Sequence, residues 1–346
     1  MRHSRSLLAQ LLHKSSPARA AKYSDSHFHL TNYIQEGTSV QDYLNMMGTT
    51  VCRSTIFGIP LQQMWQYGNT GDFAPTYYLQ TDAPLYYYSF ADAAIAMAYK
   101  SLPPEQQARL DPMIIGFNPA DMYAADHIKR VLTTFPGVFS GIGEFSIHKE
   151  FVSSKVAGGN ATLTDQALHR IFDFAGDVGL VVILHSDADV PFPKPGQEPY
   201  QLKQLGELFR QHPKTKVIWA HMGLGRVVRP VKDQLAIMDN ALGDPSLSNV
   251  HIDISWDETA KYVTGSPEAV EATAALITKY PDRFVFGSDV VAPKSIDSPM
   301  QVYNLYEPLW RKLSPEVSQK VRLGNYQRLF DAARLSVRAW EKANTK

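Results

Sequence analysis

The stretch GLVVILH at residues 179–185 is an unbroken apolar run, rich in β-branched residues, that ends in a histidine. Runs of this kind are typical of parallel strands covered on both faces. An apolar stripe with helical spacing precedes it, in Leu168, Ile171 and Phe172. The stretch KVIWAH at residues 216–221 repeats the pattern of an apolar run ending in histidine. This part of the sequence therefore predicts helices that alternate with parallel strands.

On either side of this stretch, short β-rich runs recur, and each is followed by helical periodicity. The eight runs are Lys22–Leu30, Thr50–Ile56, Met113–Asn118, Val138–Phe145, Gly179–His185, Lys216–His221, Asn249–Ser255 and Arg283–Val290. Eight alternations predict an α/β fold, a (β/α)8 TIM barrel, rather than an open doubly wound sheet. No glycine-rich dinucleotide fingerprint follows the first run. We expect one barrel domain over residues 23–346, with a long insertion after the second strand and helices at the C-terminal end.

Two segments depart from an ideal barrel. Residues 59–111 are long and aromatic-rich, and residues 187–200 are proline-rich. Both would leave the C-terminal ends of their strands, where barrel active sites lie, so we interpret them as lids or pocket walls. A packing flap or an oligomer contact is the alternative for the first, which leaves a homo-oligomer open. Residues 1–22 are basic and lack acidic residues, which suits a disordered N-terminal arm or a leader for export or organelle import.

The bulk composition of the 346 residues narrows the classes of function. Formal net charge is zero, so neither nucleic acid nor an anionic membrane surface is an expected partner. No apolar run approaches the length that spans a bilayer, and we expect a soluble, cytoplasmic protein with a small-molecule substrate. Cys52 is the only cysteine, which excludes an internal disulfide and a thiolate metal cluster. A metal site would therefore use histidines and carboxylates.

Metal-competent side chains recur at the ends of the predicted strands. DSHFHL at residues 25–30 places two histidines two residues apart, so one strand would point both to the same face. Taken singly, such residues could serve the fold alone: Glu144 could pair with Lys149, and Asp289 could cap the next helix. A barrel, however, brings the strand ends to one rim, where burying so many ionisable groups is costly without a cation. The candidate metal ligands are His27, His29, Glu144, His185, His221 and Asp289.

Five motifs occur in order along the chain: DSHFHL, LHSD, WAHMG, FGSD and LGNYQRLF. Together they resemble the amidohydrolase superfamily, and within it the amidohydrolase-related branch of metal-dependent hydrolases. The likeness runs from about Tyr23 to Phe330. It implies that His27, His29 and His185 bind a divalent metal, usually zinc, with Mn²⁺ or Fe²⁺ as alternatives. It also implies that Asp289 lies close to the water that the metal activates.

The same resemblance leaves the number of metals open. His221 would be a second-metal ligand in two-metal members, or would polarise the substrate in one-metal members. Many one-metal relatives have no ligand at the fourth strand, and two-metal relatives often have a carboxylated lysine there. A deoxyribonuclease-like group has a glutamate in a setting similar to Gly143-Glu144. Glu144 therefore permits a bridged two-metal site without requiring one.

These observations predict a metal-dependent hydrolase that cleaves a C–O or C–N bond of a small ester, lactone or amide. Asp289 would act as general base and then as general acid, while His221 would help to stabilise the oxyanion. A carboxylate-bearing or aromatic substrate is expected. The candidate substrate-binding residues are Arg226, His148, Lys149 and Trp256. For Arg226, a solvated cation at a helix start is an equally good interpretation.

The same residues are compatible with two functions other than hydrolysis. Several relatives of this branch decarboxylate aromatic or unsaturated acids, using the metal to hold the acid. Glu144 adds a further ligand to the site, and a site with so many ligands suits an activated water better than it suits decarboxylation. A barrel that binds a metal or ligand without turnover is the second rival, and the assembled ligands disfavour it.

Overall fold

The computed structural model describes residues 22–32, 37–59, 88–149, 161–190, 192, 194, 198–225 and 234–345. Eight strands form one parallel sheet in the order β1-β3-β4-β5-β6-β7-β8-β9, and β2 pairs in parallel with β10. The strands are β1 (Tyr23–Asp25), β2 (Phe28–His29), β3 (Val51–Ile56), β4 (Leu110–Ile114), β5 (Gly141–Ser146), β6 (Val181–His185), β7 (Lys216–Trp219), β8 (Val250–Asp253), β9 (Phe284–Val285) and β10 (Val290–Val291).

The two short strands β2 and β10 close the sheet into a ring. They continue β1 and β9, the two ends of the sheet order, and Val290 lies opposite Phe28 in their parallel pairing. Beside this pair, the Ser26 amide donates to the Phe286 carbonyl at 3.0 Å. The chain therefore has eight strand positions around a closed ring, and the predicted (β/α)8 barrel is confirmed.

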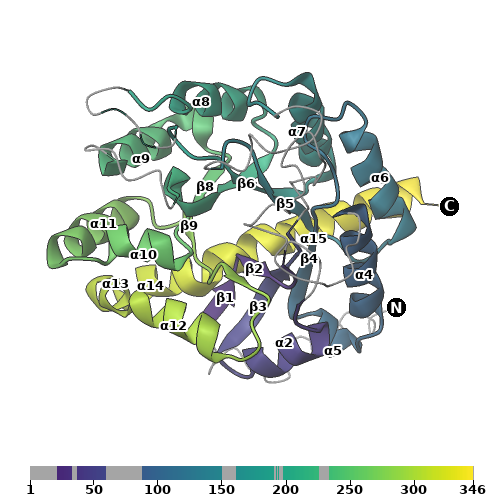
Figure 1. Cartoon of the computed structure of the whole chain (residues 1–346), viewed down its shortest axis with the longest axis horizontal. Helices are drawn as coiled ribbons and strands as arrows, with labels where there is room; N and C mark the ends of the chain where they lie inside the picture. The colour runs from purple at the N-terminus through teal and green to yellow at the C-terminus, as the bar shows by residue number, and fades with distance from the viewer. Residues whose placement is uncertain are drawn as a thin grey trace, which may run out of the picture.

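Helices surround the strands, and α15 crosses behind them (Figure 1). They are α2 (Val40–Met47), α4 (Tyr88–Lys100), α5 (Pro104–Gln107), α6 (Ala124–Thr134), α7 (Gln166–Val178), α8 (Leu202–Gln211), α9 (Gln234–Gly243), α10 (Asp257–Val263), α11 (Pro267–Lys279), α12 (Asp297–Leu305), α13 (Glu307–Lys312), α14 (Pro315–Gln319) and α15 (Asn325–Asn344), with the short turns η4 (Ala220–Gly223), η5 (Pro245–Leu247) and η6 (Lys320–Gly324). Ser266 and Ser314 cap α11 and α14, each accepting from a backbone amide at 3.2 Å.

The C-terminal helix closes one end of the barrel interior. Strand residues such as Ile183, Ile218 and Val285 form a buried cluster that also contains Tyr326 and Phe330 of α15. Burial of each large apolar side chain contributes about 1.5–3 kcal/mol to the stability of the folded state. Because α15 plugs the end where the strands begin, the polar groups of a site are confined to the end where the strands finish.

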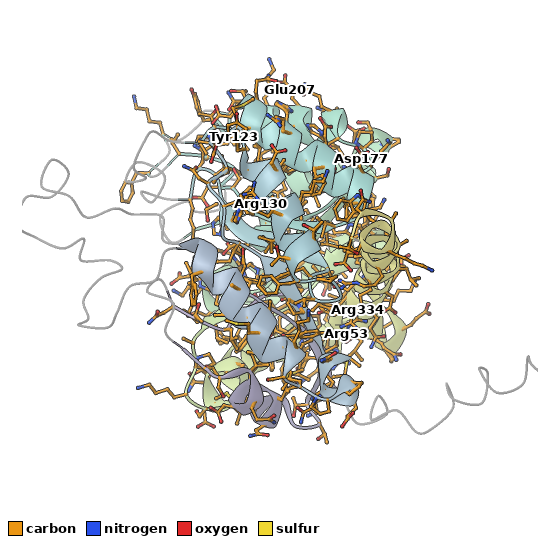
Figure 2. All side chains as sticks on the ribbon, turned by 90° about the vertical axis from the view of Figure 1, so that its right-hand side faces the viewer. Arg53, Tyr123, Arg130, Asp177, Glu207 and Arg334 are labelled. Carbon is orange, nitrogen blue, oxygen red and sulfur yellow. The ribbon has the colours of Figure 1, made fainter. Side chains whose placement is uncertain are left out.

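A buried carboxylate fixes α15 to the strands. Asp111 of β4 accepts hydrogen bonds from Arg53 of β3, through Nε at 2.6 Å and Nη2 at 2.9 Å. It also accepts from Arg334 Nε at 2.7 Å and from the Tyr326 hydroxyl at 2.7 Å. Figure 2 shows Arg53 and Arg334 close together beside the C-terminal helix. These contacts join two strands and one helix through a single side chain.

The third strand begins earlier than its sequence predicts. The predicted run is Met113–Asn118, whereas β4 spans Leu110–Ile114. Asp111 and Pro112 have the composition of a turn, but the two arginines neutralise Asp111 and allow it to be buried within a strand.

The insertion predicted over residues 59–111 is shorter than expected. Its later part contains α4, whose Ile95 and Ala96 are buried in the main core, so this helix is the barrel's own connection between β3 and β4. Residues 60–87, which carry most of its aromatic side chains, lie outside the described residues, as do residues 1–21. The interpretation of residues 59–111 and 187–200 as lids or pocket walls stays a prediction.

Candidate metal centre

The six predicted ligands lie together at the C-terminal rim of the barrel, on or beside five different strands. His27 and His29 belong to the first strand position, Glu144 to β5 and His185 to the end of β6, while His221 lies in η4 just after β7 and Asp289 just before β10. All six are largely buried, and the Asp289 side chain is the most exposed at 8%. The rim therefore gathers four imidazoles and two carboxylates in one poorly solvated space.

Glu144 lies between two pairs of histidines. Its Oε2 is 3.6 Å from His27 Nε2 and 3.4 Å from His29 Nε2. Its Oε1 is 2.5 Å from His185 Nδ1 and 3.7 Å from His221 Nε2. One carboxylate thus presents a different oxygen to each pair.

Asp289 closes the other side of the same space. Its Oδ1 lies 3.0 Å from His29 Nε2 and 3.2 Å from His27 Nε2. Its Oδ2 lies 3.6 Å from His221 Nε2. Asp289 therefore contacts histidines from both pairs, as Glu144 does.

A divalent cation fits these residues. The Nε2 atoms of His27 and His221 are buried and have no hydrogen-bond partner among the described residues, although buried ring nitrogens are normally paired. The side chains form three overlapping groups, and within each group the ligand atoms all lie within 4.8 Å of one another. The groups are His27, His29, Glu144 and Asp289; His27, His221 and Asp253; and Glu144, His185 and His221. Imidazole and carboxylate donors in such a set suit zinc and similar metals.

Neighbouring side chains orient the histidines. His27 Nδ1 lies 2.8 Å from Asp253 Oδ2, and the Ser255 hydroxyl donates to that same carboxylate at 2.6 Å. His185 Nε2 lies 3.2 Å from Asp187 Oδ1. A carboxylate on the second ring nitrogen fixes the tautomer of a histidine and raises its basicity. Sequence reasoning missed Asp253 and Asp187, although Asp187 stands within the LHSD motif and Asp253 ends a strand.

Backbone geometry helps to bring these side chains inward. Gly143 has φ of +106°, and a Cβ there would lie 2.1 Å from the Ile183 carbonyl oxygen, so only glycine allows β5 to approach β6 just before Glu144. His221 and Asp289 also have left-handed backbones, with φ of 56° and 52°. Such conformations are uncommon for residues other than glycine and cluster at functional sites.

Both carboxylates are held ionised. Burial alone would raise the pKa of Glu144, but Lys149 and His185 outweigh burial and hold it well below its usual range. Burial likewise opposes ionisation of Asp289, and His27 and His221 outweigh it, so its pKa is lowered. Burial lowers the pKa of His221. Burial also opposes the charged forms of His27, His29 and His185, but the neighbouring carboxylates outweigh burial and raise the pKa of each. Metal binding requires neutral imidazoles, so a cation would compete with protons for these three residues.

The predicted substrate-binding residues are only partly brought to this rim. Lys149 Nζ lies 3.7 Å from Glu144 Oε1, and the Trp256 ring centroid lies 4.9 Å from that of His221. His148 has a left-handed backbone, and its carbonyl accepts from the Asp187 amide at 3.1 Å. Arg226 lies outside the described residues.

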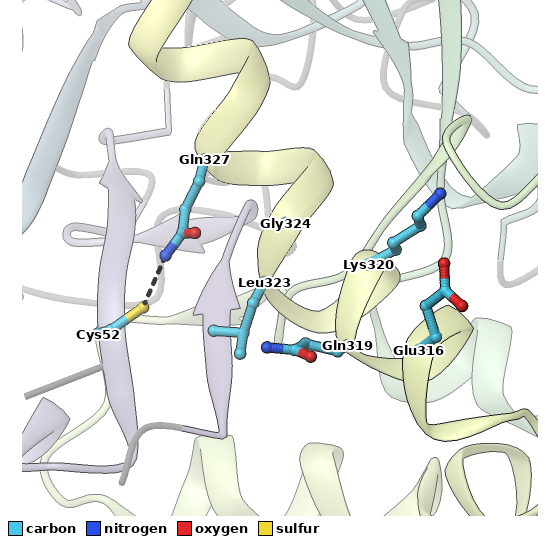
Figure 3. A pocket seen from close by; sticks show the side chains of 7 residues that line it. All are labelled: Cys52, Glu316, Gln319, Lys320, Leu323, Gly324 and Gln327. Atoms are coloured by element: carbon cyan, nitrogen blue, oxygen red, sulfur yellow. Dashed lines mark hydrogen bonds between the residues drawn. The ribbon is translucent and has the colours of Figure 1, made fainter. Parts of the chain in front are cut away.

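Two other pockets lie away from the rim, and neither is lined by histidine. One, of about 380 Å³, is lined mainly by residues of α8 and α9. The other, of about 230 Å³, lies near the start of β3 and beside η6 (Figure 3). Its lining residues are Cys52, Glu316, Gln319, Lys320, Leu323, Gly324 and Gln327. The rim is therefore the better candidate for metal chemistry.

Comparison with known proteins bears on the family and on the fold. A family model described as amidohydrolase matches residues 25–332. A solved structure named as a 2-pyrone-4,6-dicarboxylic acid hydrolase from Pseudomonas putida is 17% identical, with TM-score 0.52 and coverage of 90% of this chain and 98% of that one. A 2,6-dihydroxybenzoate decarboxylase from Rhizobium is 14% identical, with TM-score 0.51 and coverage of 90% and 98%.

A dihydroorotase from Campylobacter jejuni is also 14% identical, with TM-score 0.51 and coverage of 90% and 83%. At these identities the solved structures support the fold alone. A search of curated proteins finds no match. Among the described residues, no helix is long and apolar enough to cross a membrane.

Proposed function

The chain belongs to the amidohydrolase family and is an enzyme, and from this premise we propose that it is a metal-dependent hydrolase. Its substrate would be a small ester, lactone or amide with a carboxylate or an aromatic ring. The observation that carries the proposal is the placement of Glu144, with one oxygen toward His27 and His29 and the other toward His185 and His221.

This arrangement supports two divalent cations joined by Glu144. His27, His29 and Asp289 would complete one set of ligands, and His185 and His221 the other. Zinc is our first candidate, since it binds histidine and carboxylate donors and does not change oxidation state. Mn²⁺ and Fe²⁺ accept similar donors.

A divalent cation in this position supplies a Lewis acid that lowers the pKa of a water and polarises a carbonyl. The chain's own residues would move the proton. Asp289 remains ionised because its pKa is depressed, and it is the more exposed of the two central carboxylates. It would accept the proton of the attacking water and return it to the leaving group. With two cations bound, His221 would serve as a ligand. With one cation bound, its imidazole, which lies 3.6 Å from Asp289, would instead hold the oxygen on which charge develops.

Lys149 and Trp256 would bind the substrate beside this centre. The Lys149 side chain is 15% exposed, so its ammonium retains access to solvent while lying 3.7 Å from Glu144. A substrate carboxylate could displace part of that interaction. The Trp256 ring lies against His221 and offers an apolar face to an aromatic substrate. We retain His148 and Arg226 as further candidates for the pocket.

Elemental analysis of purified protein tests the metal part of this proposal, with two divalent metal atoms per chain as the expected result. One atom per chain would remove the bridging role of Glu144. No bound metal in protein purified without chelator, and none after incubation with Zn²⁺ or Mn²⁺, would overturn the proposal.

The reaction is tested by incubating the metal-loaded protein with panels of lactones, esters, amides and aromatic acids. Hydrolysis releases a titratable proton from an ester or lactone, or an amine from an amide, without carbon dioxide. Release of carbon dioxide without a hydrolysis product would contradict hydrolysis and favour decarboxylation on the same residues. A protein that binds metal and turns over none of these classes would favour the binding function.

A further inference from the structure

Two of the proposed ligands meet at the seam of the barrel, which is the place where the first and last strands of the sheet order, β1 and β9, come together. His27 follows β1 and Asp289 follows β9, the two ends of the sheet order, and His27 Nε2 lies 3.2 Å from Asp289 Oδ1. At this seam β1 and β9 do not pair with each other, and the ring is closed by the short β2–β10 pair and by single backbone hydrogen bonds beside it. The spacing of these two ligands therefore depends on this short pairing and on the side-chain contacts next to it.

Asp25 supplies such contacts. Its side chain is completely buried and accepts four hydrogen bonds, two at each oxygen. Oδ1 accepts from the backbone amides of His27 and Ser288, both at 3.0 Å. Oδ2 accepts from the Ser288 hydroxyl and the Tyr303 hydroxyl, both at 2.6 Å.

The chain around Asp25 is shaped to allow this approach. A Cβ on Gly287 would lie 2.4 Å from Asp25 Oδ1 and 2.6 Å from the His27 amide nitrogen. Only glycine therefore lets the eighth strand come this close to the first. Two residues after Gly287, the Asp289 amide donates to the His27 carbonyl at 2.7 Å.

We propose that Asp25 is a positioning residue of the metal centre, which sets the separation of His27 and Asp289 by holding the backbones of both strands, while Tyr303 of α12 holds Asp25. This inference rests on the proposed function, because it concerns the same two ligands. It goes beyond that function because it assigns the spacing of two ligands to Asp25, a carboxylate outside the proposed ligand set.

The structure offers a matched pair of variants to test it. Tyr303→Phe removes one hydroxyl that donates to buried Asp25 at 2.6 Å, and Tyr326→Phe removes one that donates to buried Asp111 at 2.7 Å at the other end of the barrel. Both tyrosines are buried, so each variant loses one comparable bond. A purely structural role for Asp25 predicts similar effects, whereas a positioning role predicts that only Tyr303→Phe alters the metal centre.

The first measurement is amide hydrogen exchange of the full chain after metal removal, at Ser288 and His27. We expect faster exchange in Tyr303→Phe than in Tyr326→Phe. The second is the affinity for Zn²⁺, measured by competition with a chelator. We expect Tyr303→Phe to lose about tenfold, the lower end for residues that orient ligands, and Tyr326→Phe to stay within about twofold of the parent.

The outcomes separate the two proposals. Equal exchange in both variants would overturn the role of Asp25. Unchanged zinc affinity in Tyr303→Phe would also overturn it. If exchange differs as expected but the parent protein binds no divalent cation, Asp25 holds the seam and the proposed metal-dependent function fails.

Discussion

Asp289 combines the two properties that a general base needs at this rim. Its depressed pKa keeps it ionised, and its side chain retains 8% exposure in a site whose other groups are more enclosed. We expect Asp289→Asn to lower kcat by about 10²–10⁴-fold, the usual contribution of a general base. Because the histidines and Glu144 remain, the variant should retain the fold and much of its metal. Steady-state kinetics and elemental analysis of the same preparation check both expectations.

Asp126→Asn provides the control for this experiment, since Asp126 is exposed on α6 and pairs with Arg170 at 3.0 Å, away from the rim. Its kinetics should match those of the parent. Asp289→Asn that turned over substrate at the parental rate would show that another group moves the proton.

Glu144 is the residue on which the number of cations depends. Replacing it by glutamine keeps the shape but removes the charge that faces both pairs of histidines. We expect Glu144→Gln to bind one metal atom per chain or fewer, where the parent binds two, because a neutral amide is a poor bridge between cations. Metal analysis after gel filtration measures this. Two atoms per chain in the variant would place the bridge elsewhere.

The residues of the site could be predicted from the sequence to different extents. Strand-end histidines such as His185 follow an apolar run, and this pattern is visible without a structure. Asp25 and Asp253 also lie at strand ends, but Ser288, which Asp25 contacts, and His27, which Asp253 contacts, are far away from them in the chain. No local pattern distinguishes an orienting carboxylate from a ligand. Sequence therefore reveals which groups reach the rim better than it reveals which groups hold them there.

Among the elements, α15 is joined to two strands by one buried carboxylate. Asp111 joins it to β3 and β4 through Arg53, Arg334 and Tyr326. We expect Asp111→Asn to lower the free energy of unfolding by about 3–5 kcal/mol, because the buried guanidinium of Arg53 would keep only the exposed carboxylate of Asp331 as a charged partner. Denaturant unfolding at neutral pH measures the loss.

The control is Asp331→Asn, whose side chain contacts Arg53 but is 62% exposed, so about 1 kcal/mol or less is expected. Burial opposes ionisation of Asp111, yet Arg53 and Arg334 outweigh it and lower its pKa. The stability from a lowered pKa is present above the unfolded value near 3.8 and is lost as pH falls through the folded pKa. Acid should therefore destabilise the parent more than Asp111→Asn; equal acid sensitivity would contradict this role.

Element order was easier to predict than element ends. The alternation of apolar runs and helical stripes fixes the barrel, because each strand must be buried on both faces. The run predicted to end at His221 stops at Trp219, and His221 enters a turn with φ of 56°. That turn depends on contacts such as the Leu224 amide to the His221 carbonyl at 3.0 Å, which strand periodicity does not encode.

At the scale of the whole molecule, the proposed cations would cross-link strands that are distant in sequence. Ligands come from the first, fourth, fifth, sixth and eighth strand positions, so a bound cation would resist opening of the ring at several points. The metal-free rim would instead retain buried carboxylates and imidazoles without full compensation. Metal binding should therefore appear in the stability of the entire barrel as well as in its activity.

We expect removal of the metal by a chelator to lower the free energy of unfolding by about 4 kcal/mol, relative to protein with free metal at a thousand times its Kd. Thermal unfolding before and after chelation, and again after Zn²⁺ is restored, measures this difference. The gain from metal should shrink as pH falls, since protons compete for the histidine ligands. Glu144→Gln should show a smaller gain than the parent, whereas Asp126→Asn should show the full gain. A parent protein that binds metal but unfolds at the same temperature with and without it would mean that the cations do not hold the strands together.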